Sequence, residues 1–451
     1  MILEPMTLPR QGPEAGMSRP ATARNGSPSR ESSTAESQTA GRDAGAMASG
    51  DRPEGDPHSA AGPAREGLER RLVRRPFGGG RSVSLFTLGT MRALESSRVL
   101  ERVVDAALEA GINHLETAPA YGPAEAFLGE VLAGLAERDP IGRSELVLTS
   151  KLLPGSGEGV GLAEGLEQLR ASLRRLRLPR LDNLAVHGLN TEAHLAWALR
   201  GAGAELLKAA VAEGLVGQVG FSSHGGYDLI ETALASGRFS FCSLHLHLFD
   251  PERLPLARWA LAEGMGVMAI SPADKGGRLY DPSPQLVEDC APFAPLELGY
   301  RYLLAAGIST LTLGASRPED LAWAGRLANS SGPLTPAERE AMAQLTAAGD
   351  QRLGIERCGQ CRACLPCPSE VPIPALLRLR NLAVGHGMEA YAGERYNLIG
   401  RAGHWWEAVD ASACLSCGAC LPRCPHDLAI PELLADTHHR LAAPPRRRLW
   451  G

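Results

Sequence analysis

Eight cysteines near the C-terminal end carry the clearest chemical signal in this chain. They form two runs that each end in Cys-Pro: Cys358, Cys361, Cys364 and Cys367, then Cys414, Cys417, Cys420 and Cys424. The second run has the spacing C-x2-C-x2-C-x3-C-P, which is typical of proteins that bind cubane iron–sulfur clusters. Three thiolates at this spacing hold one cluster, and the fourth completes the other. Eight thiolates therefore predict two [4Fe–4S] clusters.

Two other cysteine chemistries fit the pattern less well. Structural zinc favours paired C-x2-C knuckles that are separated by a longer loop. A disulfide framework needs an oxidising compartment, and the first residues lack the pattern of a signal peptide. We therefore expect a cytoplasmic protein with reduced thiols. The first run departs from the usual spacing, because two residues rather than three precede Cys367, which bears on how this thiolate is shared.

Length and composition indicate the domain organisation. The chain has 451 residues, enough for two or three domains. Residues 1–70 are rich in Pro, Gly, Ala and Ser and lack apolar periodicity, so we expect them to be disordered. We assign residues 71–333 to a central domain and residues 334–451 to an iron–sulfur domain with a basic tail. The net charge of -5 and the lack of a long apolar run suggest neither a nucleic acid nor a membrane as partner.

The central segment alternates short, apolar, β-rich runs with amphipathic helical patterns. The predicted strands are Val83–Thr90, His114–Ala118, Leu146–Lys151, Leu184–Gly188, Val216–Ser223, Phe241–Leu248, Gly266–Pro272 and Ile308–Gly314. Eight strands with intervening helices over about 250 residues predict an α/β fold of the (β/α)8 TIM-barrel type. The iron–sulfur domain that follows is expected to be small, mostly helical and ferredoxin-like.

An open, doubly wound sheet is the alternative architecture for such a pattern. It would carry a G-x-G-x-x-G turn after its first strand, and the glycines of residues 155–161 do not have this spacing. We expect that segment to be a flexible loop at the mouth of the barrel. Gly78-Gly79-Gly80 precedes the first strand and is interpreted as a hairpin turn.

Ionisable side chains gather where the predicted strands end. Glu116 lies at the end of the second strand, Tyr121 lies in the loop that follows, and Lys151 and His187 end the next two strands. In a barrel of this type the active site lies at the C-terminal ends of the strands. We therefore expect these four side chains to meet on one rim.

From Arg74 to Asn329 the chain resembles the aldo/keto reductase family. The resemblance rests on an ordered series of motifs: Gly89-Thr90, Ile112 to Gly122, Thr149-Ser150-Lys151, His187, Gly220-Phe221-Ser222, Lys275 to Leu279 and Gly314 to Glu319. The Lys-Gly-Gly-Arg-Leu element and the cysteine-rich end are similar to the branch of that family with a C-terminal ferredoxin-type domain.

The resemblance implies a catalytic tetrad. Tyr121 would protonate a carbonyl oxygen as NADPH delivers a hydride, His187 would orient that carbonyl, and a carboxylate would hold Lys151 in place. A buried ammonium at Lys151 can lower the pKa of Tyr121 from near 10 by about 2–3 units, which is roughly 3–4 kcal/mol. The carboxylate is Glu116, where the family has Asp. A displacement of about 1 Å by the extra methylene can cost roughly 100-fold in rate.

The resemblance also implies a site for NADP(H). The family grips the nicotinamide with Ser-Asn and Gln, and this chain has Ser222-Ser223 and Ser243 at those positions. Ser271 and Lys275 are the candidates near the pyrophosphate, while Gly314, Ser316 and Arg317 match the element that holds the adenosine phosphate. Arg317 beside Ser316 favours a 2′-phosphate, and hence NADP over NAD, through charge-assisted hydrogen bonds.

Several other polar residues are expected to be structural. His245 and His247 alternate on the sixth strand, and because two ligands do not make a metal site we expect them in barrel packing or at the nicotinamide. Cys242 and Cys290 are expected to be buried apolar residues. We expect His404-Trp405-Trp406 to pack the C-terminal domain against the barrel.

Two hypotheses about function follow. The first is an NADP-dependent oxidoreductase that reduces the carbonyl of a small-molecule aldehyde or ketone. NADPH gives a pair of electrons as hydride whereas each cluster takes one, and the sequence has no flavin-binding signature. The clusters are then structural, or they pass electrons to a redox protein partner. The second hypothesis is a non-catalytic, nucleotide-binding redox sensor, which Glu116, Ser223 and Ser243 favour.

Overall fold

The computed structural model describes residues 72–155, 159–275 and 277–444, which belong to one structural unit. The predicted disorder of residues 1–70 lies outside the described residues. The same is true of the centre of the glycine-rich loop and of the basic tail after residue 444.

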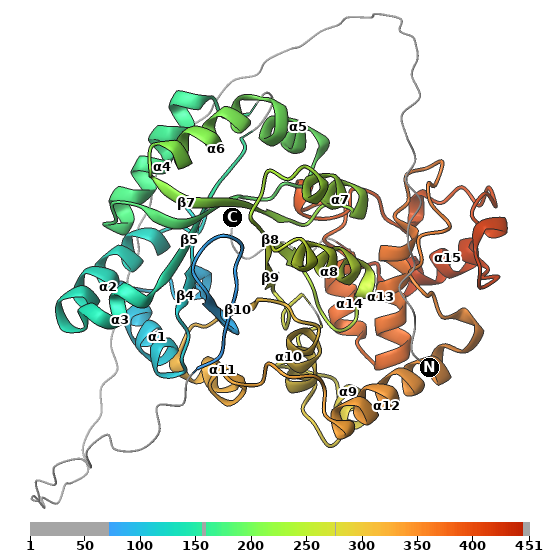
Figure 1. Cartoon of the computed structure of the whole chain (residues 1–451). Helices are drawn as coiled ribbons and strands as arrows, with labels where there is room; N and C mark the ends of the chain where they lie inside the picture. The colour runs from blue at the N-terminus through green and yellow to red at the C-terminus, as the bar shows by residue number, and fades with distance from the viewer. Residues whose placement is uncertain (1–71, 156–158, 276, 445–451) are drawn as a thin grey trace, which may run out of the picture. The chain divides into compact units, whose positions relative to one another are not determined.

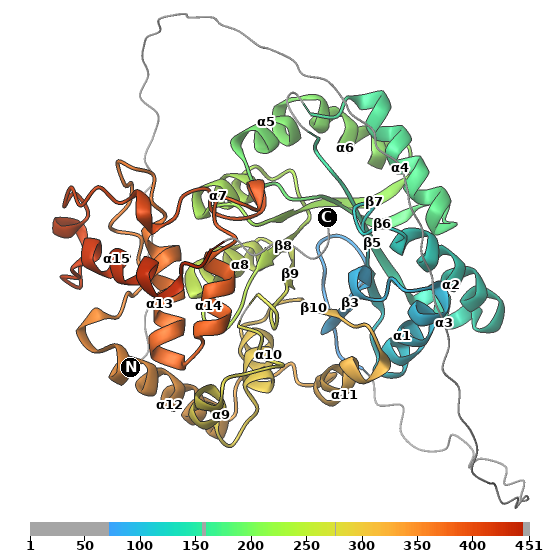
Figure 2. The same ribbon diagram turned by 180° about the vertical axis from the view of Figure 1, so that it is seen from behind.

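Eight parallel strands close into a barrel, as Figures 1 and 2 show from opposite sides. They are β3 (Phe86–Gly89), β4 (His114–Glu116), β5 (Val147–Leu152), β6 (Leu181–Val186), β7 (Val216–Ser223), β8 (Phe241–His245), β9 (Gly266–Ile270) and β10 (Thr310–Gly314). The strands follow chain order around the barrel, and β10 pairs with β3 to close it. The predicted (β/α)8 fold is confirmed, although β6 begins three residues before its predicted start at Leu184.

Helices that follow the strands cover the outside of the barrel. They are α1 (Ser97–Glu109), α2 (Ala124–Arg138), α4 (Leu162–Leu176), α5 (Glu192–Arg200), α6 (Ala202–Ala212), α7 (Tyr227–Ala235), α8 (Leu254–Ala262), α10 (Pro295–Ala305) and α11 (Ala322–Leu327). In α1, Ser96 caps the first turn by accepting a hydrogen bond from the backbone of Val99. Gly111 then follows the helix with a φ of 82°, a left-handed conformation that glycine adopts readily at the end of a helix.

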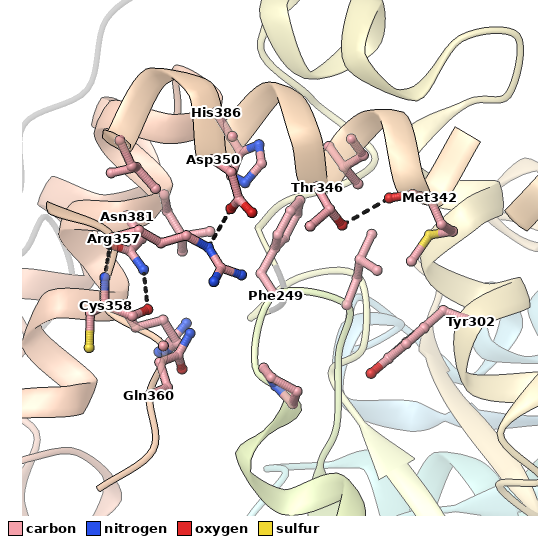
Figure 3. Close-up of a pocket in the computed structure, with 18 residues that line it drawn as sticks. Phe249, Tyr302, Met342, Thr346, Asp350, Arg357, Cys358, Gln360, Asn381 and His386 are labelled. Carbon is pink, nitrogen blue, oxygen red and sulfur yellow. Dashed lines mark hydrogen bonds and ion pairs between the residues drawn. The ribbon is translucent and has the colours of Figure 1, made fainter. Parts of the chain in front are cut away.

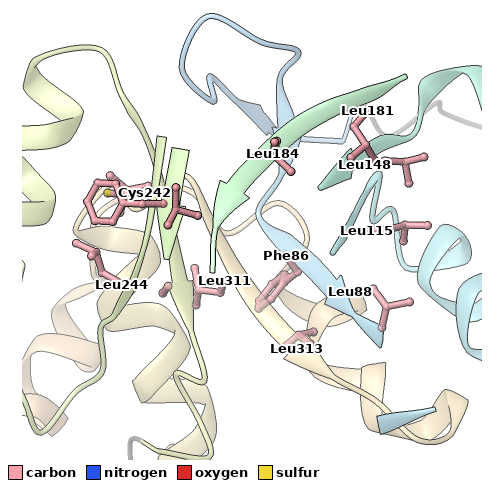
Figure 4. Packing of buried hydrophobic residues seen from close by; sticks show 14 of the residues in the cluster. Phe86, Leu88, Leu115, Leu148, Leu181, Leu184, Cys242, Leu244, Leu311 and Leu313 are labelled. Atoms are coloured by element: carbon pink, nitrogen blue, oxygen red, sulfur yellow. The ribbon is translucent and has the colours of Figure 1, made fainter. Parts of the chain in front are cut away.

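The main hydrophobic core fills the space between the strands and these helices. Leu88, Leu115 and Leu148 come from three consecutive strands and are fully or almost fully buried (Figure 4). Residues that alternate with them point into the barrel, because successive side chains of a strand face opposite sides. Thr87, for example, lies next to Leu88 and forms hydrogen bonds inside the barrel.

A belt of hydrogen-bonded polar side chains crosses the barrel interior. It links Thr310, Thr87, His114, Thr149, Asn183 and Gln218 through contacts of 2.7–3.0 Å. Both ring nitrogens of His114 are hydrogen-bonded to threonine hydroxyls. Burial lowers the pKa of His114 to about 3, so the imidazole is neutral at neutral pH. The short antiparallel strands β1 (Arg74–Arg75) and β2 (Val83–Ser84) flank the predicted glycine turn.

The C-terminal region is mostly helical, as predicted. It contains α12 (Pro336–Leu353), α13 (Ile373–His386), α14 (Glu389–Tyr396) and α15 (Ile430–Leu441), and the two cysteine runs lie in the loops before α13 and α15. These helices share a second hydrophobic core. No helix in the described part of the chain combines the length and apolar character that crossing a bilayer requires.

Candidate active site and cluster sites

The structure brings the four residues of the predicted tetrad together at the C-terminal ends of β4, β5 and β6. Lys151 forms an ion pair with Glu116 and donates a hydrogen bond of 2.6 Å to the hydroxyl oxygen of Tyr121. The Tyr121 hydroxyl lies 3.4 Å from Oε1 of Glu116. The ring of His187 stands edge-on to that of Tyr121, with centroids 5.8 Å apart. A phenol, an amine, a carboxylate and an imidazole therefore share one rim.

The longer carboxylate of Glu116 lies close to Gly89 on the neighbouring strand. A Cβ atom on Gly89 would lie 3.4 Å from Oε2 of Glu116 and 3.0 Å from the side chain of Thr312. The contact with Thr312 is tight, whereas 3.4 Å from the carboxylate is an ordinary van der Waals distance, so Glu116 itself does not require glycine at this position. The extra methylene does not separate Glu116 from Lys151, because the two side chains form an ion pair.

Burial dominates the acid–base properties of the pair. It raises the pKa of Tyr121 above its ordinary value and lowers the pKa of Lys151 well below its own. Burial thus opposes the predicted effect of Lys151 on Tyr121, and the lowering of the pKa of Tyr121 by the ammonium stays a prediction. A phenol with a raised pKa keeps its proton at neutral pH, and the Glu116 carboxylate opposes the effect of burial on Lys151 by favouring the ammonium.

The eight cysteines line two cavities, and each cavity takes three cysteines from one run and one from the other. Cys358, Cys361 and Cys364 share a cavity with Cys424, while Cys414, Cys417 and Cys420 share one with Cys367. Among the described residues, no three His, Cys, Asp or Glu side chains converge as ligands of a single ion. Because the thiols surround a cavity and do not converge on the position of one ion, they suit a cluster of four irons and four sulfides better than a single metal ion.

The backbone curls around the cavities in the same way in both runs. Gln360 and Arg362 have φ values of 56° and 65°, and the equivalent residues Ser416 and Gly418 have values of 50° and 73°. For non-glycine residues such left-handed conformations are unfavourable by roughly 1–2 kcal/mol each. Their recurrence at matching positions indicates that the two loops are built for the same task.

Comparison with known proteins identifies the family. A family model described as the aldo/keto reductase family matches residues 86–287. Over 231 residues the chain is 31% identical to a 6-dehydroglucose reductase of Novosphingobium aromaticivorans, and the match covers 47% of this chain and 71% of that protein. The chain belongs to the aldo/keto reductase family.

Other comparisons support this assignment and cover the C-terminal region. An aldo-keto reductase of Mycolicibacterium vanbaalenii is 28% identical over 219 residues, which is 48% of this chain and 73% of that protein. The solved structure of the aldo-keto reductase AKR11C1 from Bacillus halodurans shares the fold, with a TM-score of 0.51, 23% identity and coverage of 60% of this chain and 96% of that one. A model described as a 4Fe-4S dicluster domain matches residues 357–429. This aldo/keto reductase is therefore an oxidoreductase fused to an iron–sulfur domain.

The iron–sulfur domain of this aldo/keto reductase covers part of the barrel mouth. The ring of Trp405 lies 5.4 Å from that of His187 and 5.2 Å from that of His224. A Cβ atom on Gly188 would lie 2.5 Å from the Trp405 ring, so only glycine allows this contact. Asn190 donates a hydrogen bond of 3.1 Å to the backbone oxygen of His404. The predicted packing of residues 404–406 against the barrel is confirmed, and these contacts add His224 and Asn190, which the sequence analysis missed.

The three serines expected near the nicotinamide lie at the C-terminal end of β7 and on β8, with different partners. Ser223 donates a hydrogen bond of 2.6 Å to the backbone oxygen of Leu189, and Ser222 accepts one of 3.0 Å from the backbone of Gly188. The hydroxyl of Ser243 is fully buried and has no hydrogen-bond partner among the described residues. Ser243 is thus the serine with unused hydrogen-bonding capacity.

A basic cluster lies beside these serines. Nζ of Lys275 lies 3.3 Å from Nδ1 of His224, whose Nε2 lies 3.2 Å from Nε2 of His245. Burial and the nearby charge of Arg395 lower the pKa of Lys275 to about 8. His247, by contrast, lies 3.9 Å from Asp250. The cluster presents one cation and neutral imidazoles to the mouth.

The predicted adenosine-phosphate element lies after β10. Ser316 and Arg317 are exposed, and both donate hydrogen bonds to the carboxylate of Asp320. Asp320 thereby fixes the backbone turn that follows Gly314. Ser271 follows β9 directly and has a left-handed φ of 52°.

Proposed function

We propose that this protein is an NADP-dependent carbonyl reductase that reduces an aldehyde or ketone, with two [4Fe–4S] clusters in its C-terminal domain. The contact of Lys151 with both Glu116 and the Tyr121 hydroxyl carries the proposal. It connects a proton donor to a cation that can stabilise the phenolate left after proton transfer.

The side chains divide the reaction among them. NADPH, when bound, supplies the hydride. Tyr121 donates its proton to the carbonyl oxygen, Lys151 stabilises the resulting phenolate from 2.6 Å, and Glu116 keeps Lys151 charged. His187 is neutral at neutral pH, because burial lowers its pKa to about 3, so its imidazole can donate a hydrogen bond that orients the carbonyl.

The cofactor assignments rest on unused polar groups and charge. The buried hydroxyl of Ser243, which lacks a partner in the described part of the chain, would form a hydrogen bond with the carboxamide of the nicotinamide, beside Ser222 and Ser223. Lys275 supplies a cation for the pyrophosphate, near Ser271. Residues Gly314, Ser316 and Arg317 would receive the 2′-phosphate of NADP, for which the exposed Arg317 would exchange its ion pair with Asp320.

The cysteine cavities support the cluster assignment. Cys358, Cys361, Cys364 and Cys424 would hold one [4Fe–4S] cluster, and Cys367, Cys414, Cys417 and Cys420 the other. A redox protein partner would exchange electrons with them one at a time.

Replacing Tyr121 by Phe tests the proposal. With a panel of aldehydes, ketones and an oxidised sugar, we expect Tyr121→Phe to lose about 100-fold or more in kcat/KM while it still binds NADPH, because the proton donor is lost. The control is Tyr300→Phe, which alters a buried tyrosine that packs on Phe86 away from the site. Equal NADPH-dependent turnover in both variants would refute the assignment of Tyr121.

One observation favours a nucleotide-binding redox sensor as the second candidate function. Trp405 stands against His187 at the place where a substrate carbonyl would bind. In a sensor, NADPH would bind without turnover on any member of the panel. In the reductase, Trp405 would form a wall of the substrate site.

A further inference from the structure

A cavity of about 270 Å³ lies between the barrel and the iron–sulfur domain, away from the tetrad (Figure 3). Its walls come from the loop after β8, from α10, α12 and α13, and from the start of the first cysteine run. Phe249 and Tyr302 contribute the barrel side, and Thr346 lies at an exposed position of α12. None of the functions assigned above uses this cavity.

The cavity is a direct neighbour of one cluster site. Cys358 and Gly359 line both this cavity and the one that Cys361, Cys364 and Cys424 share. Asn381, on the cavity wall, donates a hydrogen bond of 2.8 Å to the backbone oxygen of Cys358. A molecule in the cavity would therefore be separated from that cluster by a single segment of chain.

The polar groups of the cavity favour a neutral ligand with an oxygen acceptor. Arg378 is 8% exposed, and its Nη1 has no hydrogen-bond partner among the described residues. The charge of Arg378 is already compensated by Asp250, 3.6 Å away, and Arg357 is paired with Asp350. A buried donor without a partner is unfavourable, and a carbonyl oxygen would give it one without adding a charge.

Size and shape favour a small aromatic ring system. The volume lies just below the range of roughly 300–1,000 Å³ typical of ligand cavities, which suits one or two fused rings rather than a nucleotide. Most of the remaining wall is apolar: Leu248, Met342, Leu345, Leu353 and Leu382. Phe249 and Tyr302 offer rings against which a planar molecule can pack.

We propose that this cavity binds a quinone, with one carbonyl oxygen accepting a hydrogen bond from Arg378. The inference rests on the proposed function only for the two clusters and does not involve Tyr121. Two clusters that each carry one added electron hold the pair that a quinone needs. The quinone takes up these two electrons and two protons from water and becomes a quinol, while both clusters return to their oxidised state. The electrons enter the clusters from the one-electron redox partner.

Binding is tested on the cluster-loaded full chain by equilibrium dialysis with menadione, in a Tyr121→Phe background without NADPH. We expect Thr346→Trp, which fills the cavity, to weaken binding at least about tenfold, or roughly 1.4 kcal/mol. Ala347→Trp is the matched control, since Ala347 is exposed on the same helix but does not line the cavity. Methylnaphthalene has the same rings without carbonyls and should also bind about tenfold more weakly than menadione. Equal affinity of the two tryptophan variants, or of the two ligands, would overturn the proposal.

The redox step has its own readout. Clusters reduced with dithionite and freed of excess reductant are mixed with menadione without oxygen, and the recovery of cluster absorbance is followed. Recovery should be at least about tenfold slower in Thr346→Trp than in Ala347→Trp, matching the change in affinity. Equal rates would exclude the cavity as the route. Loss of carbonyl reduction in Tyr121→Phe would leave these results unchanged, so this proposal and the proposed function fail separately.

Discussion

Replacing Glu116 by Gln should weaken catalysis strongly while leaving the barrel folded. The variant keeps the size of the side chain but removes the carboxylate that faces Lys151. Burial already lowers the pKa of Lys151, so without Glu116 the amine should lose its proton more readily. Tyr121 would then give up its proton without a cation beside it.

The separation of Lys151 and Tyr121 sets the magnitude. Two unit charges 2.6 Å apart attract each other by roughly 6 kcal/mol at an effective dielectric constant of about 20. If about half of this is expressed in the transition state, the barrier rises by about 3 kcal/mol and kcat/KM falls by roughly 100- to 200-fold. Glu116→Asp keeps the charge but retracts it by one methylene, so we expect a smaller loss than in Glu116→Gln.

The assay is NADPH-dependent reduction of one aldehyde that the wild type accepts, followed by NADPH absorbance. Glu125→Gln is the matched control, because Glu125 is also a buried carboxylate but bonds Ser150 and Arg175 outside the barrel interior. It should lower stability without lowering kcat/KM. Wild-type kcat/KM in Glu116→Gln would refute the reasoning that the carboxylate keeps Lys151 charged.

Four further predictions address other parts of the molecule. The pKa of Lys275 is about 8, so its charge is present below pH 8 and lost above it; NADPH affinity should fall as pH rises through 8, and Lys275→Met should remove that pH dependence. The pKa of His114 is about 3 in the folded state and about 6.5 in the unfolded state, so the free energy of unfolding should fall by up to about 1.4 kcal/mol per pH unit below pH 6.5. Urea unfolding at several pH values should show a smaller dependence of this free energy on pH in His114→Asn. Cys424→Ser should lose about half of the iron, because Cys424 shares its cavity with three cysteines of the first run and their cluster would be lost. If each run held its own cluster without the other, the cluster of the first run would stay intact in this variant. Trp405→Ala should extend activity to bulkier carbonyl compounds with little change in NADPH affinity, and an unchanged substrate profile would exclude Trp405 from the substrate site.

The sequence carried most of the information about the barrel because strands and helices have different apolar periods. Two predicted strands start three residues from the observed ones: β3 was expected from Val83 and begins at Phe86, and β6 was expected from Leu184 and begins at Leu181. Asn183, which the β6 prediction left out, belongs to the buried polar belt. Such a belt can be recognised only when the neighbouring strands are in place.

The sequence predicted which residues form the site, but not their burial, their pKa values or all of their contacts. The rule that strand ends meet on one rim was enough to group Tyr121 with Lys151 and His187. Whether Glu116 reaches Lys151 depends on how β4 and β5 pair, and the pKa of Tyr121 depends on burial, which sequence spacing does not encode. The packing of Trp405 against the barrel was predicted, but its contact with His187, more than 200 positions away in the chain, was not.

The most direct test of the central claim follows the hydride itself. NADPH carrying deuterium at the transferred position is incubated with the wild type and an accepted aldehyde without oxygen, and the alcohol is analysed by mass spectrometry. A carbonyl reductase should place one deuterium on the carbinol carbon for each NADPH consumed. Oxidation of NADPH without deuterium in the alcohol, or binding of NADPH without any alcohol from the whole panel, would contradict the account.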